Sequence, residues 1–277
     1  MIDRKEKTQR SQSIYFNLCV LCDLFFVSFV VKTFFKYILK ALKKGENMEE
    51  RRHTSREYER ELQEIKEGLI YLGALVEKAI EQSIKSLMDR DAELAQKIIC
   101  DDDMIDQLDI EIEEKCIRVL ALRQPTARDL RFITTAIKIN GHLERIGDMA
   151  VNIAEKTIIL DKEPQMKPYI DIPRMAEIAQ VMIRESLDSL VHENVELANK
   201  VRRDDETIDD LNDQIFRELL TYMMEDVRTI HRALIISQVS KSLERIADHA
   251  VGIADMVVYM VTGKSVRHGA ICNPGEV

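Results

Sequence analysis

Residues 143–155 read LERIGDMAVNIAE and residues 243–255 read LERIADHAVGIAD, so one block of thirteen residues occurs twice in this chain of 277. The copies lie one hundred positions apart and agree at nine positions. Similarity at a fixed offset is typical of a duplicated structural unit. Core packing explains the shared Leu, Ile and Ala, but it gives no reason to keep Glu144 with Asp148 and Glu244 with Asp248. The block therefore predicts a duplicated fold and singles out these acids.

Apolar residues recur at helical spacing on both sides of the block, and neither half shows a strand pattern. Asp91 is expected to cap the second helix, Thr126 and Asp129 to form a capping box before the third, and Gly263 to end the last. The expected fold is all-α, with six long helices in two pseudo-symmetric three-helix bundles. The six helices are predicted at roughly 54–89, 92–121, 126–160, 171–192, 195–222 and 226–262.

The same signals divide the chain into segments. Two prolines in DKEPQMKPY (161–169) indicate a linker between the halves. We expect an apolar and basic N-terminal extension, a first bundle, the linker, a second bundle and a loose tail. Their predicted bounds are 1–47, 48–160, 161–170, 171–263 and 264–277.

The extension allows three interpretations. Residues 14–31 are almost wholly apolar and are followed by lysines, as in a membrane anchor with a cytoplasmic basic flank. An interfacial helix is the second interpretation. We favour the third, a working protein that starts at Met48, because MEERRHTSREYEREL opens a charged helical sequence and Asp23 would be costly inside a bilayer.

Charge excludes one class of partner. The net charge is −9, and residues 1–47 carry 9 Lys and Arg against 4 Asp and Glu, so the rest of the chain carries −14. An acidic body of this kind repels nucleic acid and attracts cations or basic protein surfaces.

Acid pairs also recur in the second helix of each half. Asp102 and Asp106 lie one turn apart on one face, and Asp205 and Asp209 repeat that spacing. Like charges at i, i+4 repel each other on an isolated helix, so their repetition suggests a compensating cation. Carboxylate oxygens suit Mg²⁺, Mn²⁺, Ca²⁺ or a ferric ion better than Zn²⁺. The competing interpretation is an ordinary solvated face.

The helical wheel places the acids of the third helices opposite the apolar seam. We therefore expect Glu144, Asp148, Glu244 and Asp248 to be exposed carboxylates rather than buried acids with raised pKa values. Gly252 stands where the first copy has Asn152, which favours a poorer second site. No Gly-rich phosphate loop, nucleophile elbow or HExxH motif is present, and the scattered histidines are interpreted as surface residues.

The two blocks, together with RQPTARDLR (123–131) and LTYMMEDVRTI (220–230), resemble the PhoU family over about residues 50–268. The resemblance implies a cytoplasmic helical regulator, not an enzyme, that dimerises and represses the phosphate-starvation response. It would do so by linking the ATPase subunit of the phosphate ABC transporter to the sensor histidine kinase. The resemblance also implies metal ions (Mg, Mn or Fe) at the acid motifs. They are Glu144/Asp148 and Glu244/Asp248, with Asp102/Asp106 and Asp205/Asp209 as the matching acids.

Two other functions remain open from the sequence. One is a metal-dependent enzyme of phosphate metabolism, which would need a water-excluding pocket beside the metals. The other is a membrane-tethered PhoU-like subunit of a phosphate permease, which depends on residues 14–31. Membrane association would otherwise come through the partners.

Overall fold

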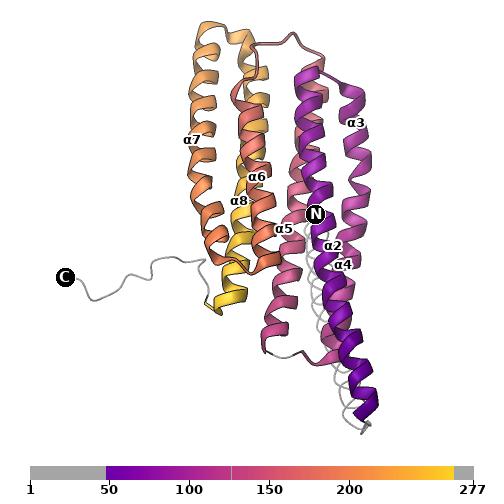
Figure 1. The fold of residues 1–277 in the computed structure, drawn as a ribbon. Helices are drawn as coiled ribbons and strands as arrows, with labels where there is room; N and C mark the ends of the chain where they lie inside the picture. The colour runs from indigo at the N-terminus through magenta and orange to yellow at the C-terminus, as the bar shows by residue number, and fades with distance from the viewer. Residues whose placement is uncertain (1–47, 126, 265–277) are drawn as a thin grey trace, which may run out of the picture. The chain divides into compact units, whose positions relative to one another are not determined.

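The computed structural model describes residues 48–125 and 127–264, and the side chains from residue 56 onward. Within these ranges every regular element is a helix, as predicted, and none of the helices is long and apolar enough to cross a bilayer (Figure 1). Segment 14–31, Thr126 and the tail beyond Lys264 lie outside the described residues. The helices are α2 (Met48–Asp89), α3 (Ala92–Asp101), α4 (Asp103–Arg123), α5 (Ala127–Asp161), α6 (Asp171–His192), α7 (Val195–Glu225), a 3₁₀ turn η1 (Val227–Thr229) and α8 (Ile230–Thr262).

The chain divides into two compact units. Among the described residues, the smaller comprises 48–58 and Arg118–Gln124, and the larger comprises Glu59–Ile117, Pro125 and 127–264. In the smaller unit an ion pair of 3.0 Å joins Arg123 Nη2 to Glu57 Oε2. The larger unit contains both copies of the repeated block and all eight predicted metal-binding acids.

The predicted helix ends are confirmed where they are described. Asp91 precedes α3 and its carboxylate accepts a 2.9 Å hydrogen bond from the Leu94 N–H, as an N-cap should. Asn194 has the same role at α7, accepting from the Glu196 and Leu197 N–H groups at 3.0 and 3.1 Å. Gly263 follows α8 with φ 71°, the left-handed conformation of a C-terminal cap.

One predicted helix is interrupted. The sequence predicted a single helix over 92–121, but the structure separates α3 from α4 at Asp102. The Asp102 carbonyl accepts from both the Ile105 N–H (2.8 Å) and the Asp106 N–H (3.1 Å), so an i+3 hydrogen bond is added there to the i+4 bond. Asp102 itself stays near helical dihedrals, at φ −63° and ψ −29°. The corresponding helix of the second half, α7, is continuous.

The duplication extends beyond the repeated block, to the first two helices of each half. In α2 the Ser86 hydroxyl donates to the Ser83 carbonyl at 2.8 Å, and in α6 the Ser189 hydroxyl donates to the Ser186 carbonyl at 2.6 Å. The chain then turns through a residue of positive φ, 56° at position 90 and 52° at position 193. Positions 90 and 193 are 103 residues apart, whereas the two copies of the repeated block are 100 residues apart. The connection before the third helix is therefore three residues longer in the first half.

The third helices form the centre of the core. The predicted seam of α5 and the matching positions of α8 are fully buried, because each helix contacts neighbours over most of its circumference. The seam residues are Ile139, Leu143, Ile146, Ala150 and Ile153, with Val239, Leu243, Ile246, Ala250 and Ile253. Leu62, Leu94 and Leu108 of α2, α3 and α4 are only partly buried.

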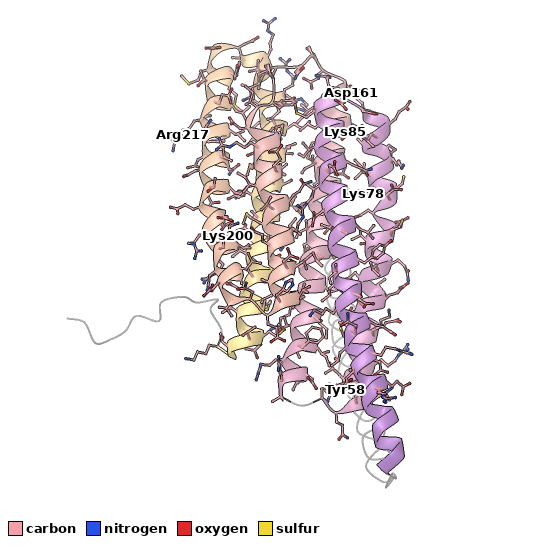
Figure 2. The ribbon with its side chains drawn as sticks, viewed as in Figure 1. Tyr58, Lys78, Lys85, Asp161, Lys200 and Arg217 are labelled. Carbon is pink, nitrogen blue, oxygen red and sulfur yellow. The ribbon has the colours of Figure 1, made fainter. Side chains whose placement is uncertain are left out.

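In the larger unit α5 and α8 lie side by side, α3 packs on α5, and α6 and α7 pack on α8 (Figure 1). The halves are also joined through α2 and α6. Arg184 Nη2 lies 2.7 Å from Glu77 Oε2, and Lys66 Nζ donates to the Val191 carbonyl at 2.7 Å. Charged side chains such as Arg217 of α7 point away from the helices (Figure 2). The contact between α5 and α8 joins the two halves, since each helix comes from a different half.

Candidate metal centres

The first group of acids lies between α3–α4 and α5. Asp102 and Asp106 come from the α3–α4 junction, and Glu144 and Asp148 come from α5. The pKa of Asp102 is raised to about 6, first by burial and then by the charges of Asp106, Asp148 and Glu144. Acids separated by about forty residues therefore interact at one place. We call these four residues the first cluster.

The second half repeats the arrangement. Asp205 and Asp209 of α7 lie near Glu244 and Asp248 of α8, and these four form the second cluster. The pKa of Asp205 is also raised to about 6, first by burial and then by Asp209, Asp248 and Glu244. The same causes raise the pKa of Asp209. The structure thus brings together, in two sets, all eight acids that the sequence singled out.

The expectation of exposed third-helix acids without raised pKa values is wrong for Glu144, and the expected exposure is wrong for Glu244 as well. Burial raises the pKa of Glu144 as well as those of Asp102 and Asp205. The Glu144 side chain is 24% exposed and that of Glu244 is 17% exposed. The cause is the second helix of each half, which packs beside the third and covers one flank of its acidic face.

Basic side chains offset part of the negative charge. Arg145 Nε lies 3.2 Å from Glu144 Oε2, and its Nη1 lies 3.0 Å from Asp148 Oδ2. In the second cluster the ion pair comes from Lys241, which contacts Glu244 Oε2. The sequence analysis did not identify Lys241, although its position one turn before Glu244 is the ordinary spacing of a helical ion pair.

Hydrogen-bonded polar residues accompany the acids in both halves, and in the second half they reach a member of the cluster. Asn140, which is buried, donates to the carbonyl and the carboxylate of Asp109 at 2.8 and 2.6 Å. At the corresponding place in the second half, the Ser240 hydroxyl donates to Asn212 Oδ1 at 2.5 Å. Asn212 Nδ2 in turn donates to Glu244 Oε2 at 3.2 Å. The sequence analysis missed Asn140 and Ser240, and their signal is a polar residue within the apolar seam, one turn before the Glu.

The donor set fits a hard cation. Asp102 Oδ1 and Asp205 Oδ1 are buried and accept no hydrogen bond from the described residues, and a buried carboxylate oxygen without a partner is costly. An ion bound at each cluster would give the buried oxygen there a partner. Carboxylate oxygens are the ligands that Mg²⁺ and Mn²⁺ prefer. A pocket of about 80 Å³, lined in part by Lys78 and Asp102, opens beside the first cluster.

The clusters are not preformed chelates. Within residues 56–264, no three His, Cys, Asp or Glu side chains converge closely enough to hold an ion as they stand. The pKa values nevertheless show that the carboxylates interact electrostatically. The carboxylates are thus close enough to interact but too far apart to bind an ion as they stand. Before an ion binds, the carboxylate side chains must rotate, and Arg145 and Lys241 must move away from them.

The family model of the PhoU domain matches this chain twice, over residues 69–157 and 172–257. The chain belongs to the PhoU family. It is 45% identical over 217 residues to the phosphate-specific transport system accessory protein PhoU homolog of Aquifex aeolicus, covering 78% of this chain and 98% of that protein. The corresponding Pseudomonas aeruginosa protein is 41% identical and is covered to 90%.

Two solved PhoU structures share the fold. The crystal structure of PhoU from Pseudomonas aeruginosa aligns with a TM-score of 0.72 and 40% identity, covering 75% of this chain and all of that one. The phosphate transport system regulatory protein PhoU of Streptococcus pneumoniae aligns with a TM-score of 0.70 and 28% identity, over 76% and 99% of the two chains. The fold class predicted from the sequence is therefore confirmed.

The raised pKa values of the clusters predict how stability depends on pH without metal. A carboxyl whose pKa rises from 3.8 to about 6 on folding binds its proton more tightly in the folded state. Proton binding to this carboxyl therefore adds to the free energy of unfolding at low pH, and this stabilisation is lost as the pH rises through 6. We expect Asp102→Asn and Asp205→Asn each to stabilise the metal-free protein at pH 7.5 by about 1 kcal/mol, a figure reduced for partial solvent screening.

The measurement is urea unfolding with chelator at pH 4.5, 6 and 7.5. The gain from either substitution should shrink as the pH falls below 6, because the folded wild-type carboxyl then takes up a proton and no longer carries a partly buried charge. Asp213→Asn, on the exposed face of α7, is the matched control. A gain for Asp102→Asn that is the same at all three pH values would contradict burial as the cause of its raised pKa.

Proposed function

We propose that this protein is a negative regulator of the phosphate-starvation response and a modulator of phosphate uptake. The observation that carries the proposal is the double match to the PhoU domain over nearly the whole helical region. Relatives with 41–45% identity are named as accessory proteins of phosphate-specific transport, and a structural relative is named as a regulatory protein. The proposed role is regulatory rather than catalytic.

In this proposal the protein is a cytoplasmic adaptor between the ATPase subunit of a phosphate ABC transporter and a sensor histidine kinase. An adaptor needs exposed surfaces that a partner protein can cover. The end of α7 and the following turn carry such side chains, with Met224 86% exposed and Val227 75% exposed. Leu220 lies one turn and Phe216 two turns before Met224, and both are also exposed. These residues support docking of another protein, as does the acidic charge of the body.

The proposal includes metal ions at the two clusters and a homodimer as the working form. Mg²⁺, Mn²⁺ or ferric iron bound to the carboxylates would neutralise the most acidic faces of α5 and α8. The protein would then present a different charge to its partners with and without metal. The pairing of like acids in both halves and the two buried Asp oxygens without partners support the cation sites.

Deletion of the gene tests the regulatory role. Phosphate-starvation promoters should stay active in high phosphate in the deletion strain, because the kinase has lost its inhibitor. A promoter reporter in phosphate-replete medium measures this, and the full-length chain supplied from a plasmid should restore repression. Normal repression in the deletion strain would rule out the adaptor role.

A pull-down from phosphate-replete cells should recover the transporter ATPase subunit and a histidine kinase.

A further inference from the structure

Two histidines from different halves of the molecule contact each other. His142 of α5 and His249 of α8 lie with their Nδ1 atoms 3.0 Å apart and their ring centroids 5.3 Å apart, at an interplanar angle of 62°. Both side chains are partly buried. The sequence interpretation of these residues as separate surface histidines is therefore wrong, because residues 107 positions apart meet where α5 packs against α8.

A glycine makes room for the pair. A Cβ atom on Gly252 would lie 2.4 Å from His142 Cε1 and 2.9 Å from its Nδ1, which no side chain could tolerate without moving the ring. This explains why Gly252 stands where the first copy of the block has Asn152. The residues that correspond to His142 and His249 in the other half are Ser242 and Met149. The duplicated fold therefore packs without imidazoles at this place, so the fold alone does not require them.

The distance suits a shared metal ion. Zn²⁺ binds imidazole nitrogen at about 2.0–2.1 Å in a tetrahedral arrangement, which places two ligand nitrogens about 3.3 Å apart. The observed 3.0 Å needs only a few tenths of an ångström of opening. Without an ion, one Nδ1 must carry a proton and donate to the other. With an ion, both nitrogens act as ligands.

We propose that His142 and His249 bind one borderline divalent ion, such as Zn²⁺, Ni²⁺ or Cu²⁺, across the interface of α5 and α8. Imidazole nitrogen favours these ions, whereas the carboxylate clusters favour Mg²⁺ and Mn²⁺. Water completes the coordination, since no third ligating side chain among the described residues converges on the pair. The site is separate from the clusters in its residues and in its ligand type. An ion bound there cross-links the two halves of the molecule.

The test is titration of the purified full-length protein with Zn²⁺ and with Ni²⁺, by calorimetry in a buffer that does not chelate metals. The variants His142→Ser and His249→Met introduce the residues found at the corresponding positions of the other half, so each should fold. Each should lose one bound equivalent per chain relative to wild type. His192→Ala, an exposed histidine at the end of α6, is the matched control and should keep that equivalent.

A fourth variant separates this site from the clusters. It replaces Glu144 and Glu244 by Gln and Asp148 and Asp248 by Asn, and it should retain the histidine-dependent Zn²⁺ equivalent. Loss of that equivalent in the cluster variant, with the two histidine variants unchanged, would overturn the proposal and assign the ion to the carboxylates. Identical isotherms for all the proteins would overturn it as well. Thermal melting should agree, because Zn²⁺ should raise the wild-type midpoint more than those of the two histidine variants.

Discussion

Removing four carboxylates is expected to abolish the stabilisation of this protein by Mg²⁺ or Mn²⁺. An ion that binds only the folded state adds about 2.7 kcal/mol when its free concentration is one hundred times its Kd. Wild type should gain about this amount for each occupied cluster over the chelator-treated protein, while the variant should gain little. The variant carries Glu144→Gln, Asp148→Asn, Glu244→Gln and Asp248→Asn.

With chelator the order of stability should reverse. The substitutions remove repulsion within each cluster and relieve the cost of partly burying Glu144, whose pKa is raised for that reason. They also remove the ion pairs of Arg145 and Lys241, which are partly exposed and each contribute at most about 1 kcal/mol. We therefore expect the metal-free variant to be as stable as wild type or slightly more stable.

The measurement is urea unfolding of both proteins with chelator, with Mg²⁺ and with Mn²⁺. A second variant with the same change of charge but outside the clusters is the control, and metal should still stabilise it. It carries Glu114→Gln, Asp188→Asn, Asp213→Asn and Glu225→Gln, all at exposed positions. If metal leaves the wild-type unfolding curve unchanged, and the isolated protein contains no metal, the eight acids form only a solvated face.

The helices could be predicted from the sequence because the apolar seams are long and regular. Leu143, Ile146 and Ala150 recur at helical spacing, and all are fully buried. The break at Asp102 could not be predicted in this way. Ile98 and Ile105 lie two turns apart, in register for one continuous helix, and Asp102 itself remains near helical dihedrals. At the junction of α3 and α4 the Asp102 carbonyl accepts an i+3 hydrogen bond in addition to the i+4 bond.

The acids could be identified from the sequence, but their environment could not. A helical wheel relates each residue to one seam of its own helix, and it contains no information about a neighbouring helix that covers the flank. Asp102 and Asp205 are partly buried because α5 and α8 pack beside them, and burial is the first cause of their raised pKa values. The contact of His142 with His249 was missed for the same reason, since no spacing within one helix relates them.

Replacing Gly252 by Ala is expected to change stability in opposite directions depending on residue 142. In the wild-type background the new Cβ would lie 2.4 Å from His142 Cε1 and force the ring away from His249. Overpacking of this kind costs about 1–3 kcal/mol. The substitution also gains about 1 kcal/mol, because alanine favours the helix interior more than glycine does. The net effect should be a loss of up to about 2 kcal/mol.

With His142→Ser the clash disappears and only the helix preference remains. Gly252→Ala should then stabilise the protein by about 1 kcal/mol, so the two positions should couple by about 1–3 kcal/mol in a double-mutant cycle. Urea unfolding with chelator measures the cycle without a contribution from bound metal. Gly141→Ala is the control, since a Cβ there meets nothing within 4 Å, and it should stabilise both backgrounds equally. Equal effects of Gly252→Ala in the two backgrounds would show that His142 does not occupy the space above Gly252.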